Sequence, residues 1–215
     1  MKTRLAVAAV AACAVLAVIA ALGLTGPAGS AQGVRLVRQS DGSMVLADTG
    51  GTAPVLDVYE DYDCPVCKES HTLVDATIQR LAREGKVKVV FHPVTIFRDE
   101  PMRSNSVRAA AAARCVPEAN WLAFRDELYG MQPAPHGVAS GFTVEELVAA
   151  ARKAGAAVDE CVASQAYAEA HLLESARARI DGTPTLMLDG RVLGGEAFDP
   201  RALEAAIVGE PGVTV

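Results

Sequence analysis

Short runs in which apolar residues alternate with polar ones predict the first strands of the chain. Residues 34–37 and 43–47 are two such runs, and they flank Asp41-Gly42, a dipeptide that favours a tight hairpin turn. Residues 54–59 form a third run that is almost wholly apolar, which is typical of a buried strand. The folded part of the chain is therefore predicted to start with a hairpin and a buried strand.

A helix and another strand follow the buried strand. Apolar residues recur at helical spacing among charged residues between Cys67 and Gly85. Residues 86–92 then predict the next strand. A strand, a helix and a strand indicate a βαβ unit, in which the two strands are parallel and the crossover is right-handed.

A helical insertion is predicted over about residues 101–179. Four stretches carry helical patterns, over residues 102–114, 121–131, 145–154 and 160–179, the last of them broken near Ser164. Thr143 opens a Thr-Val-Glu-Glu segment, which is a capping-box signature for the third helix. Trp121, Phe124 and Leu128 stand at helical spacing, so we expect them in the core of the insertion, with an apolar groove for unfolded substrate as the alternative.

The chain returns to strands after the insertion. Residues 185–188 and 191–193 predict two strands joined by Asp189-Gly190, and residues 201–208 predict a last helix. The whole pattern indicates an α/β fold with a mixed sheet, in which a helical insertion separates the βαβ half from the ββα half.

The N-terminal residues 1–31 predict an export segment. Lys2 and Arg4 precede an uncharged stretch over residues 5–24, and the positive-inside rule keeps this basic end in the cytoplasm. The uninterrupted length favours an uncleaved membrane anchor, whereas the small residues up to Ala31 allow removal as a signal peptide. In both cases residues 32–215 are expected outside the cytoplasm as one domain.

The charge balance excludes nucleic acid as the partner. The 215 residues carry a formal net charge of −6 and show no basic cluster, whereas proteins that bind nucleic acid present a basic surface. Hydrophobic residues make up 51% of the chain, which is enough for a buried core of ordinary size.

Four cysteines remain once Cys13, within the hydrophobic export segment, is set aside: Cys64, Cys67, Cys115 and Cys161. An even count in an oxidising compartment suggests two disulfides, and four cysteines allow three pairings. The short spacing makes Cys64 with Cys67, and hence Cys115 with Cys161, the natural choice. Closing the longer loop should stabilise the fold by roughly 4 kcal/mol. We therefore expect a structural bridge at Cys115–Cys161 and a bridge that opens and closes at Cys64–Cys67.

Cys64-Pro65-Val66-Cys67 stands where the buried strand ends and the long helix begins. At a helix N-terminus, unpaired N–H groups and the helix dipole favour the thiolate form of the first cysteine. The thiolate is the nucleophile of disulfide exchange. The spacing alone is weak, because zinc ribbons, haem attachment sites and structural bridges also use it.

Further motifs place this segment in a family context. They are residues 55–67, Phe91-His92-Pro93-Val94, residues 121–129 and Gly182-Thr183-Pro184-Thr185. Their order and context, over about residues 34–209, resemble the DsbA-like thioredoxin family in the form common among exported actinobacterial proteins. The resemblance implies a thioredoxin-like mixed sheet and an extracytoplasmic thiol-disulfide oxidoreductase that forms disulfides in exported proteins.

The resemblance also implies roles for individual residues. Cys64, expected to be the more exposed thiol, attacks or is attacked in a mixed disulfide with the substrate, and Cys67 resolves it. Thr183 and Pro184 correspond to a cis-proline loop, which presents backbone groups to an extended substrate. The redox-active Cys64–Cys67 disulfide takes the place of a cofactor, and no metal is expected.

Acidic residues near the motif have two interpretations each. Asp57 interrupts the buried strand where the family often carries a buried acid, so it is expected either to accept the proton of Cys67 or to reach solvent from an edge strand. Glu60, Asp61 and Asp63 either oppose the reactive thiolate or form a solvated acidic turn.

Two other residues limit the chemistry. Val66 supplies no cation between the two cysteines, which argues against a very oxidising potential. His71 follows Cys67 by four residues and could join it as a metal ligand, but no second Cys or His pair stands at ligand spacing.

The partners and the location follow from the resemblance and the export segment. Reduced or unfolded exported proteins are the expected substrates, and a membrane oxidase of the DsbB or vitamin K epoxide reductase type is the expected electron acceptor. The location is the outer face of the cell membrane, or outside the cell if the segment is cleaved. Two alternatives remain: a disulfide reductase of the same fold, and a non-catalytic anchored binding protein whose C-x-x-C is a structural staple.

Overall fold

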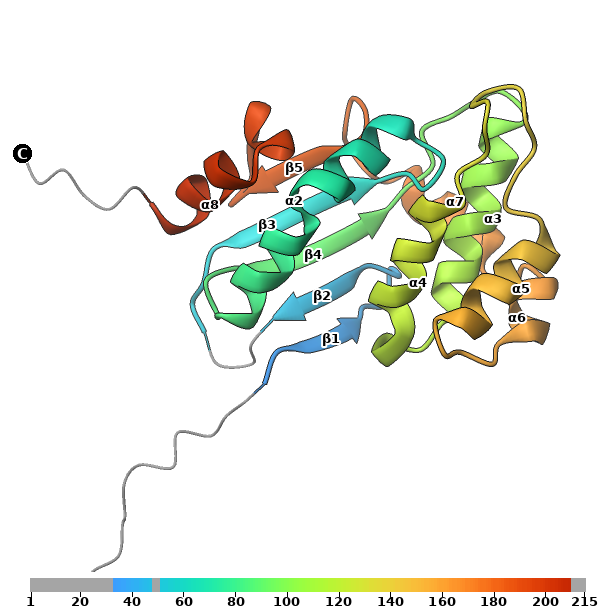
Figure 1. Cartoon of the computed structure of the whole chain (residues 1–215), viewed down its shortest axis with the longest axis horizontal. Helices are drawn as coiled ribbons and strands as arrows, with labels where there is room; N and C mark the ends of the chain where they lie inside the picture. The colour runs from blue at the N-terminus through green and yellow to red at the C-terminus, as the bar shows by residue number, and fades with distance from the viewer. Residues whose placement is uncertain (1–32, 48–50, 210–215) are drawn as a thin grey trace, which may run out of the picture. The chain divides into compact units, whose positions relative to one another are not determined.

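The computed structural model describes residues 33–47 and 51–209 (Figure 1). The predicted export segment, including Cys13, lies outside the described residues. Within them, no helix combines the length and the apolar character that a membrane span requires.

One mixed sheet of six strands forms the centre of the fold, in the order β1-β2-β4-β3-β5-β6. The strands are β1 (Arg35–Arg38), β2 (Met44–Ala47), β3 (Val55–Glu60), β4 (Lys88–Pro93), β5 (Thr185–Leu188) and β6 (Arg191–Val192). The predicted βαβ unit is confirmed, because β3 and β4 pair in parallel while every other pair is antiparallel. The thioredoxin-like α/β fold expected from the sequence is therefore present.

Helices cover and extend this sheet. They are α2 (Pro65–Arg83), α3 (Met102–Cys115), α4 (Glu118–Gly130), α5 (Val144–Lys153), α6 (Asp159–Ala163), α7 (Ala168–Ser175) and α8 (Pro200–Val208), with a short 3₁₀ helix η1 (Gly195–Phe198) before the last. Figure 1 shows α2 lying across the sheet with α8 beside it, while α3 to α7 gather at one end of the sheet. The insertion between β4 and β5 is thus helical, as the pattern predicted.

Local signals in the sequence explain where several helices begin. Thr143 and Glu146 form the predicted capping box of α5, since the Glu146 N–H donates to Thr143 Oγ1 and the Thr143 N–H donates to Glu146 Oε2. The Asp199 carboxylate accepts from the N–H groups of Arg201 and Ala202 and so caps α8.

Two apolar regions meet at the sheet. Val74, Ile78 and Leu81 of α2 are buried in the same core cluster as Leu56 and Val89 of the central strands. In the insertion, the side chains of Trp121, Phe124 and Leu128 are fully buried, and the Trp121 ring lies 5.4 Å from that of Phe91. These three residues belong to the core, so the groove interpretation is wrong.

Cys115 and Cys161 form a disulfide, the pairing expected from the sequence. Their Cα atoms are 5.9 Å apart, and the bridge joins the end of α3 to α6. It therefore ties together two helices of the insertion, away from the Cys64-Pro65-Val66-Cys67 segment.

Candidate active site

The two remaining described cysteines lie at the start of α2. Cys64 is the N-cap residue and Pro65 follows at the first helical position, where proline is favoured because its φ angle suits a helix and its missing N–H would be unpaired. Cys67 lies in the first turn, and both thiols are free. Cys64 is 4% exposed and Cys67 is 2% exposed. Cys64 is thus the more exposed of the two, as predicted, but only slightly. An incoming sulfur therefore has a narrow path to Cys64.

The backbone of the Thr183–Pro184 loop partly covers Cys64. The peptide bond between Thr183 and Pro184 is cis, as the resemblance implied. The Cys64 Sγ lies 3.5 Å from the Thr183 carbonyl oxygen, to which Cys64 donates a hydrogen bond when it is protonated. The loop and the reactive sulfur, 119 residues apart in sequence, are therefore in contact.

The two thiols have different environments, which shift their pKa values in opposite directions. A hydrogen bond donated by the Cys67 thiol, helped by N–H groups of the first helical turn, lowers the pKa of Cys64 from an ordinary 9.0 to about 6. Burial raises the pKa of Cys67 far above its usual range. Near neutral pH, Cys64 is therefore the thiolate and Cys67 holds the proton, which matches their expected roles as attacking and resolving cysteine.

Asp57 does not lie beside Cys67. Side chains alternate along β3, and Val58 and Glu60 point toward α2, so Asp57 points to the opposite face of the sheet. There its carboxylate lies 2.8 Å from His92 Nε2. The expectation that Asp57 accepts the proton of Cys67 is corrected by this placement.

The acid nearest the thiols is Asp61. Its backbone N–H donates to Cys67 Sγ at 3.5 Å. Its buried carboxylate accepts hydrogen bonds from the Ser106 hydroxyl at 2.6 Å and from the Ile96 and Asp63 N–H groups at 2.9 Å. Burial, with a smaller contribution from the charge on the Cys64 thiolate, raises the pKa of Asp61 to about 7.

Glu60 and Asp63 are also buried, so the interpretation of a solvated acidic turn is wrong. The Glu60 carboxylate accepts two hydrogen bonds from the Arg125 guanidinium, at 2.6 and 2.7 Å, and one from the Tyr129 hydroxyl. Asp63 accepts from Asn105 Nδ2 at 3.3 Å. The helices of the insertion thus provide the partners that allow these acids to be buried.

A glutamine of the insertion also fixes the loop before Cys64. Gln132, in the connection between α4 and α5, donates from Nε2 to the carbonyl oxygens of Tyr62 at 2.8 Å and Cys64 at 3.0 Å. The sequence pattern did not single out Gln132, because its partners are about 70 residues away and are backbone atoms.

One group of the described side chains has ligand atoms close enough for a metal ion. His71, Asp75 and Asp126 place one nitrogen and two oxygens within 4.8 Å of one another. Asp75, however, already binds the Arg125 guanidinium at 2.5 Å. A fixed positive charge on the same carboxylate opposes a second cation, so this group fits a metal poorly.

Replacing Asp61 by asparagine is expected to lower the pKa of Cys64 further. The Asp61 carboxylate, when charged, repels the thiolate, and its removal should shift the titration by up to about one pH unit, or ~1.4 kcal/mol. The ultraviolet absorbance of the thiolate during a pH titration measures the change. Asp63→Asn is the matched control, because Asp63 is buried in the same loop and Cys64 is among the groups that shift the pKa of Asp61 but not among those that shift the pKa of Asp63. An equal shift in both variants would contradict a specific effect of Asp61.

Comparisons with known proteins agree with this geometry. The family model Thioredoxin_4, described as thioredoxin, matches residues 45–208. No curated protein matches the chain in sequence. Oxidised DsbA from Mycobacterium tuberculosis is 28% identical, with 83% of this chain and 95% of that chain covered and a TM-score of 0.65. Reduced DsbG, a disulfide bond oxidoreductase of the same organism, is 27% identical, with 83% and 89% covered and a TM-score of 0.65.

A third structure supports the fold alone. MdbA from Actinomyces oris, a thiol-disulfide oxidoreductase, is 24% identical to this chain. The alignment covers 80% of this chain and 90% of MdbA, with a TM-score of 0.67. The described fold therefore recurs in proteins that exchange disulfides.

Proposed function

Because the chain belongs to the Thioredoxin_4 family and is a thiol-disulfide oxidoreductase of the DsbA type, we propose that it forms disulfides in exported proteins. In the proposed reaction a substrate thiolate attacks Cys64 of the Cys64–Cys67 disulfide, and Cys67 leaves. A second substrate thiolate then attacks the mixed disulfide and frees Cys64. The substrate loses two electrons and the enzyme gains them.

The lowered pKa of Cys64 is the observation that carries the oxidising direction. A thiolate with a pKa of about 6, against 9.0 for an ordinary cysteine, stabilises the reduced enzyme at pH 7 by about 1.4 kcal/mol. An enzyme whose reduced form is stabilised is a stronger oxidant, here by roughly 30 mV. A purely structural C-x-x-C staple would leave Cys64 with an ordinary pKa, so the observation also counts against the non-catalytic alternative.

The docking of substrate is proposed at the Thr183–Pro184 loop. The Thr183 carbonyl lies against the reactive sulfur. Pro184 has no backbone N–H, so it cannot compete with the substrate for pairing with the backbone groups of this loop. An extended substrate segment can pair with backbone groups of this loop while its own sulfur approaches Cys64.

Re-oxidation and location belong to the same proposal. The enzyme must pass two electrons on after each cycle, and we assign this step to a membrane oxidase of the DsbB or vitamin K epoxide reductase type. The basic, uncharged and small residues of 1–31 support export, with the enzyme held at the outer face of the membrane or released if the segment is cleaved.

One observation favours the reverse direction, reduction of disulfides. The Asp61 carboxylate beside the thiols opposes the thiolate, and the exposed side chain between the cysteines, Val66, carries no charge that could stabilise it. Both features lower the oxidising power of the site.

Equilibration of the enzyme with glutathione buffers separates the two directions. We expect a potential above that of thioredoxin, which is about −270 mV, and below that of strongly oxidising DsbA, about −120 mV. We also expect the oxidised enzyme to restore activity to reduced, unfolded ribonuclease. A potential near the thioredoxin value, with no gain of active ribonuclease, would assign the enzyme to reduction.

The reduced and oxidised enzymes should differ in how their stability depends on pH. The folded pKa of Cys64 is lower than its unfolded value, so its contribution to the stability of the reduced form is full above about pH 9 and is lost as the pH falls through about 6. Between pH 5 and pH 8, the reduced form should gain about 2–3 kcal/mol relative to the oxidised form. Urea unfolding of both forms at the two pH values measures this, and a constant difference would contradict the assigned thiolate.

A further inference from the structure

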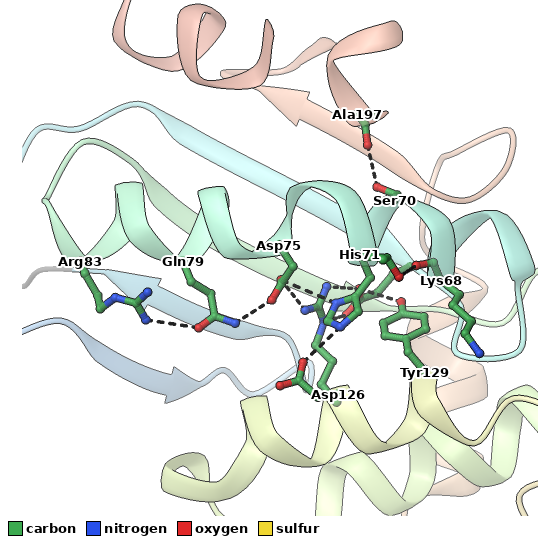
Figure 2. A network of polar contacts seen from close by, with 12 residues as sticks. Lys68, Ser70, His71, Asp75, Gln79, Arg83, Asp126, Tyr129 and Ala197 are labelled. Carbon is green, nitrogen blue, oxygen red and sulfur yellow. Dashed lines mark hydrogen bonds and ion pairs between the residues drawn. The ribbon is translucent and has the colours of Figure 1, made fainter. Parts of the chain in front are cut away.

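A small cavity separates Cys67 from a polar network between α2 and α4. Its volume is about 10 Å³, which is the space of one water molecule, and Cys67, Glu60 and His71 are among the residues that line it. Figure 2 shows His71 on α2 with Asp75 beside it and with Asp126 and Tyr129 facing it from α4. The cavity therefore connects the resolving thiol with side chains that lead toward the surface.

His71 spans the distance from this cavity to solvent. It follows Cys67 by one helical turn and is 14% exposed. Its Nδ1 is buried and has no hydrogen-bond partner among the described residues, with Asp75 Oδ1 3.8 Å away. Its Nε2 lies 3.1 Å from Asp126 Oδ1, and the Asp126 side chain is 56% exposed. One ring nitrogen thus faces the interior and the other faces a solvated carboxylate.

The other polar groups around the cavity are already occupied. Both oxygens of Glu60 accept from Arg125, and Asp75 accepts from Arg125 and from Gln79. The Arg125 guanidinium does not release a proton in proteins. Asp61, near the thiols, has its carboxylate oxygens taken by Ser106 and two backbone N–H groups. The His71 imidazole, by contrast, has an open nitrogen, and an imidazole can both accept and donate a proton.

We propose that His71 carries the proton of Cys67 between the cavity and the surface, through one water molecule in the cavity. This inference rests on the proposed function. While Cys64 is tied up in a mixed disulfide, it cannot accept that proton, so a second route is needed. The charged groups that face the imidazole are the carboxylates of Asp75 and Asp126 and the guanidinium of Arg125, and Glu60 lies across the cavity.

The step is balanced when glutathione disulfide re-oxidises the enzyme. The Cys64 thiolate attacks one sulfur of glutathione disulfide and releases one glutathione thiolate. Cys67 gives its proton to the water as the water gives one to His71 Nδ1, and the Cys67 thiolate attacks the Cys64 sulfur and releases the second glutathione. One protein disulfide has formed, one glutathione disulfide has been reduced, and the imidazolium returns a proton to solvent from Nε2. Substrate oxidation runs the proton transfer in the opposite direction.

The test follows the reaction of the reduced full chain with glutathione disulfide, using acid quenching and mass spectrometry to separate two phases. In His71→Gln, formation of the mixed disulfide at Cys64 should keep its rate, because that attack does not use the Cys67 proton. Resolution by Cys67 should slow by about tenfold or more. In His71→Ala, added imidazole should restore part of the resolution rate, which a merely structural loss would not allow.

Two further variants keep the test decisive. Asp126→Asn changes an exposed side chain, so it should fold, and it should slow resolution by a few-fold because the acceptor at Nε2 loses its negative charge. Gln79→Ala is the matched control, since it removes another contact of Asp75 on the same helix without touching the cavity. We expect its resolution rate to be unchanged.

The outcomes distinguish this inference from the proposed function. Resolution at the wild-type rate in both His71→Gln and Asp126→Asn would overturn the role of His71. Slowing of both phases without rescue by imidazole would overturn it too, because it would indicate a disturbed fold. A wild-type enzyme that fails to oxidise reduced ribonuclease, yet shows the two phases with glutathione disulfide, would overturn only the proposed direction.

Discussion

Cys64→Ser is expected to abolish disulfide exchange, with a loss of at least about a thousandfold in the oxidation of reduced ribonuclease. The serine hydroxyl can occupy the same N-cap position beneath the Thr183 carbonyl, so the fold should persist. It cannot form a disulfide, and no other described free thiol is placed to replace it, because Cys67 is deeper and keeps its proton. Recovery of ribonuclease activity measures the loss.

Cys67→Ser provides the informative comparison. This variant keeps the Cys64 thiolate but lacks the resolving thiol, so mixed disulfides with substrate or glutathione should accumulate instead of turning over. Mass spectrometry of acid-quenched samples detects the adduct. Substantial turnover by Cys64→Ser would show that the reaction does not pass through this sulfur and would leave only the structural interpretation of the motif.

Removal of the second bridge should have a large effect of another kind. Replacing both Cys115 and Cys161 by serine opens a loop of 46 residues in sequence separation and should lower the free energy of unfolding by about 4 kcal/mol. In a domain of this size, that corresponds to a fall in Tm of roughly 8–16 °C. Changing both residues avoids leaving a free thiol that could be oxidised by the active site.

Activity distinguishes a structural bridge from a catalytic one. Below its lowered Tm, the double variant should oxidise ribonuclease at about the wild-type rate, because the disulfide joins helices of the insertion and does not touch Cys64. Calorimetry gives the Tm and the refolding assay gives the rate. A variant that is folded at the assay temperature yet inactive would refute the division of labour between the two bridges.

The order of helices and strands was predictable because each depends on local chemistry. The capping box at Thr143, the Asp41-Gly42 turn and the break near Ser164 all act within a few residues, and the structure has each of them. The helix of the motif begins at Pro65 rather than at Cys67, since proline fits the first helical position.

The placement of Asp57 could not be predicted in the same way. Apolar residues occupy both faces of the central strand β3, so the sequence around Asp57 shows no alternation that would assign it to one face. The registration of β3 against β4 sets the face, and it brings Asp57 to His92. The resemblance to a family pointed to Asp57 as the acid near the thiols, whereas the structure places Asp61 there.

The burial of the acidic loop was missed for a related reason. The side chains that donate to Glu60, Asp61 and Asp63 are all distant in sequence. Their partners Arg125 and Ser106 come from α4 and α3, so the spacing of residues carries no signal of the contact. Such long-range polar pairs become visible only when the insertion is placed against the sheet.

Because side chains of the helical insertion donate to these carboxylates, the insertion cannot be removed on its own, either by engineering or in evolution. Excising α3 to α7 would remove Ser106, Asn105 and Arg125, whose side chains donate to these three acids, and each acid that stayed both buried and ionised would cost several kcal/mol. Glu60, Asp61 and Asp63 would have to be substituted at the same time. Substitutions in the acidic loop and changes in the helical insertion are therefore expected to occur together.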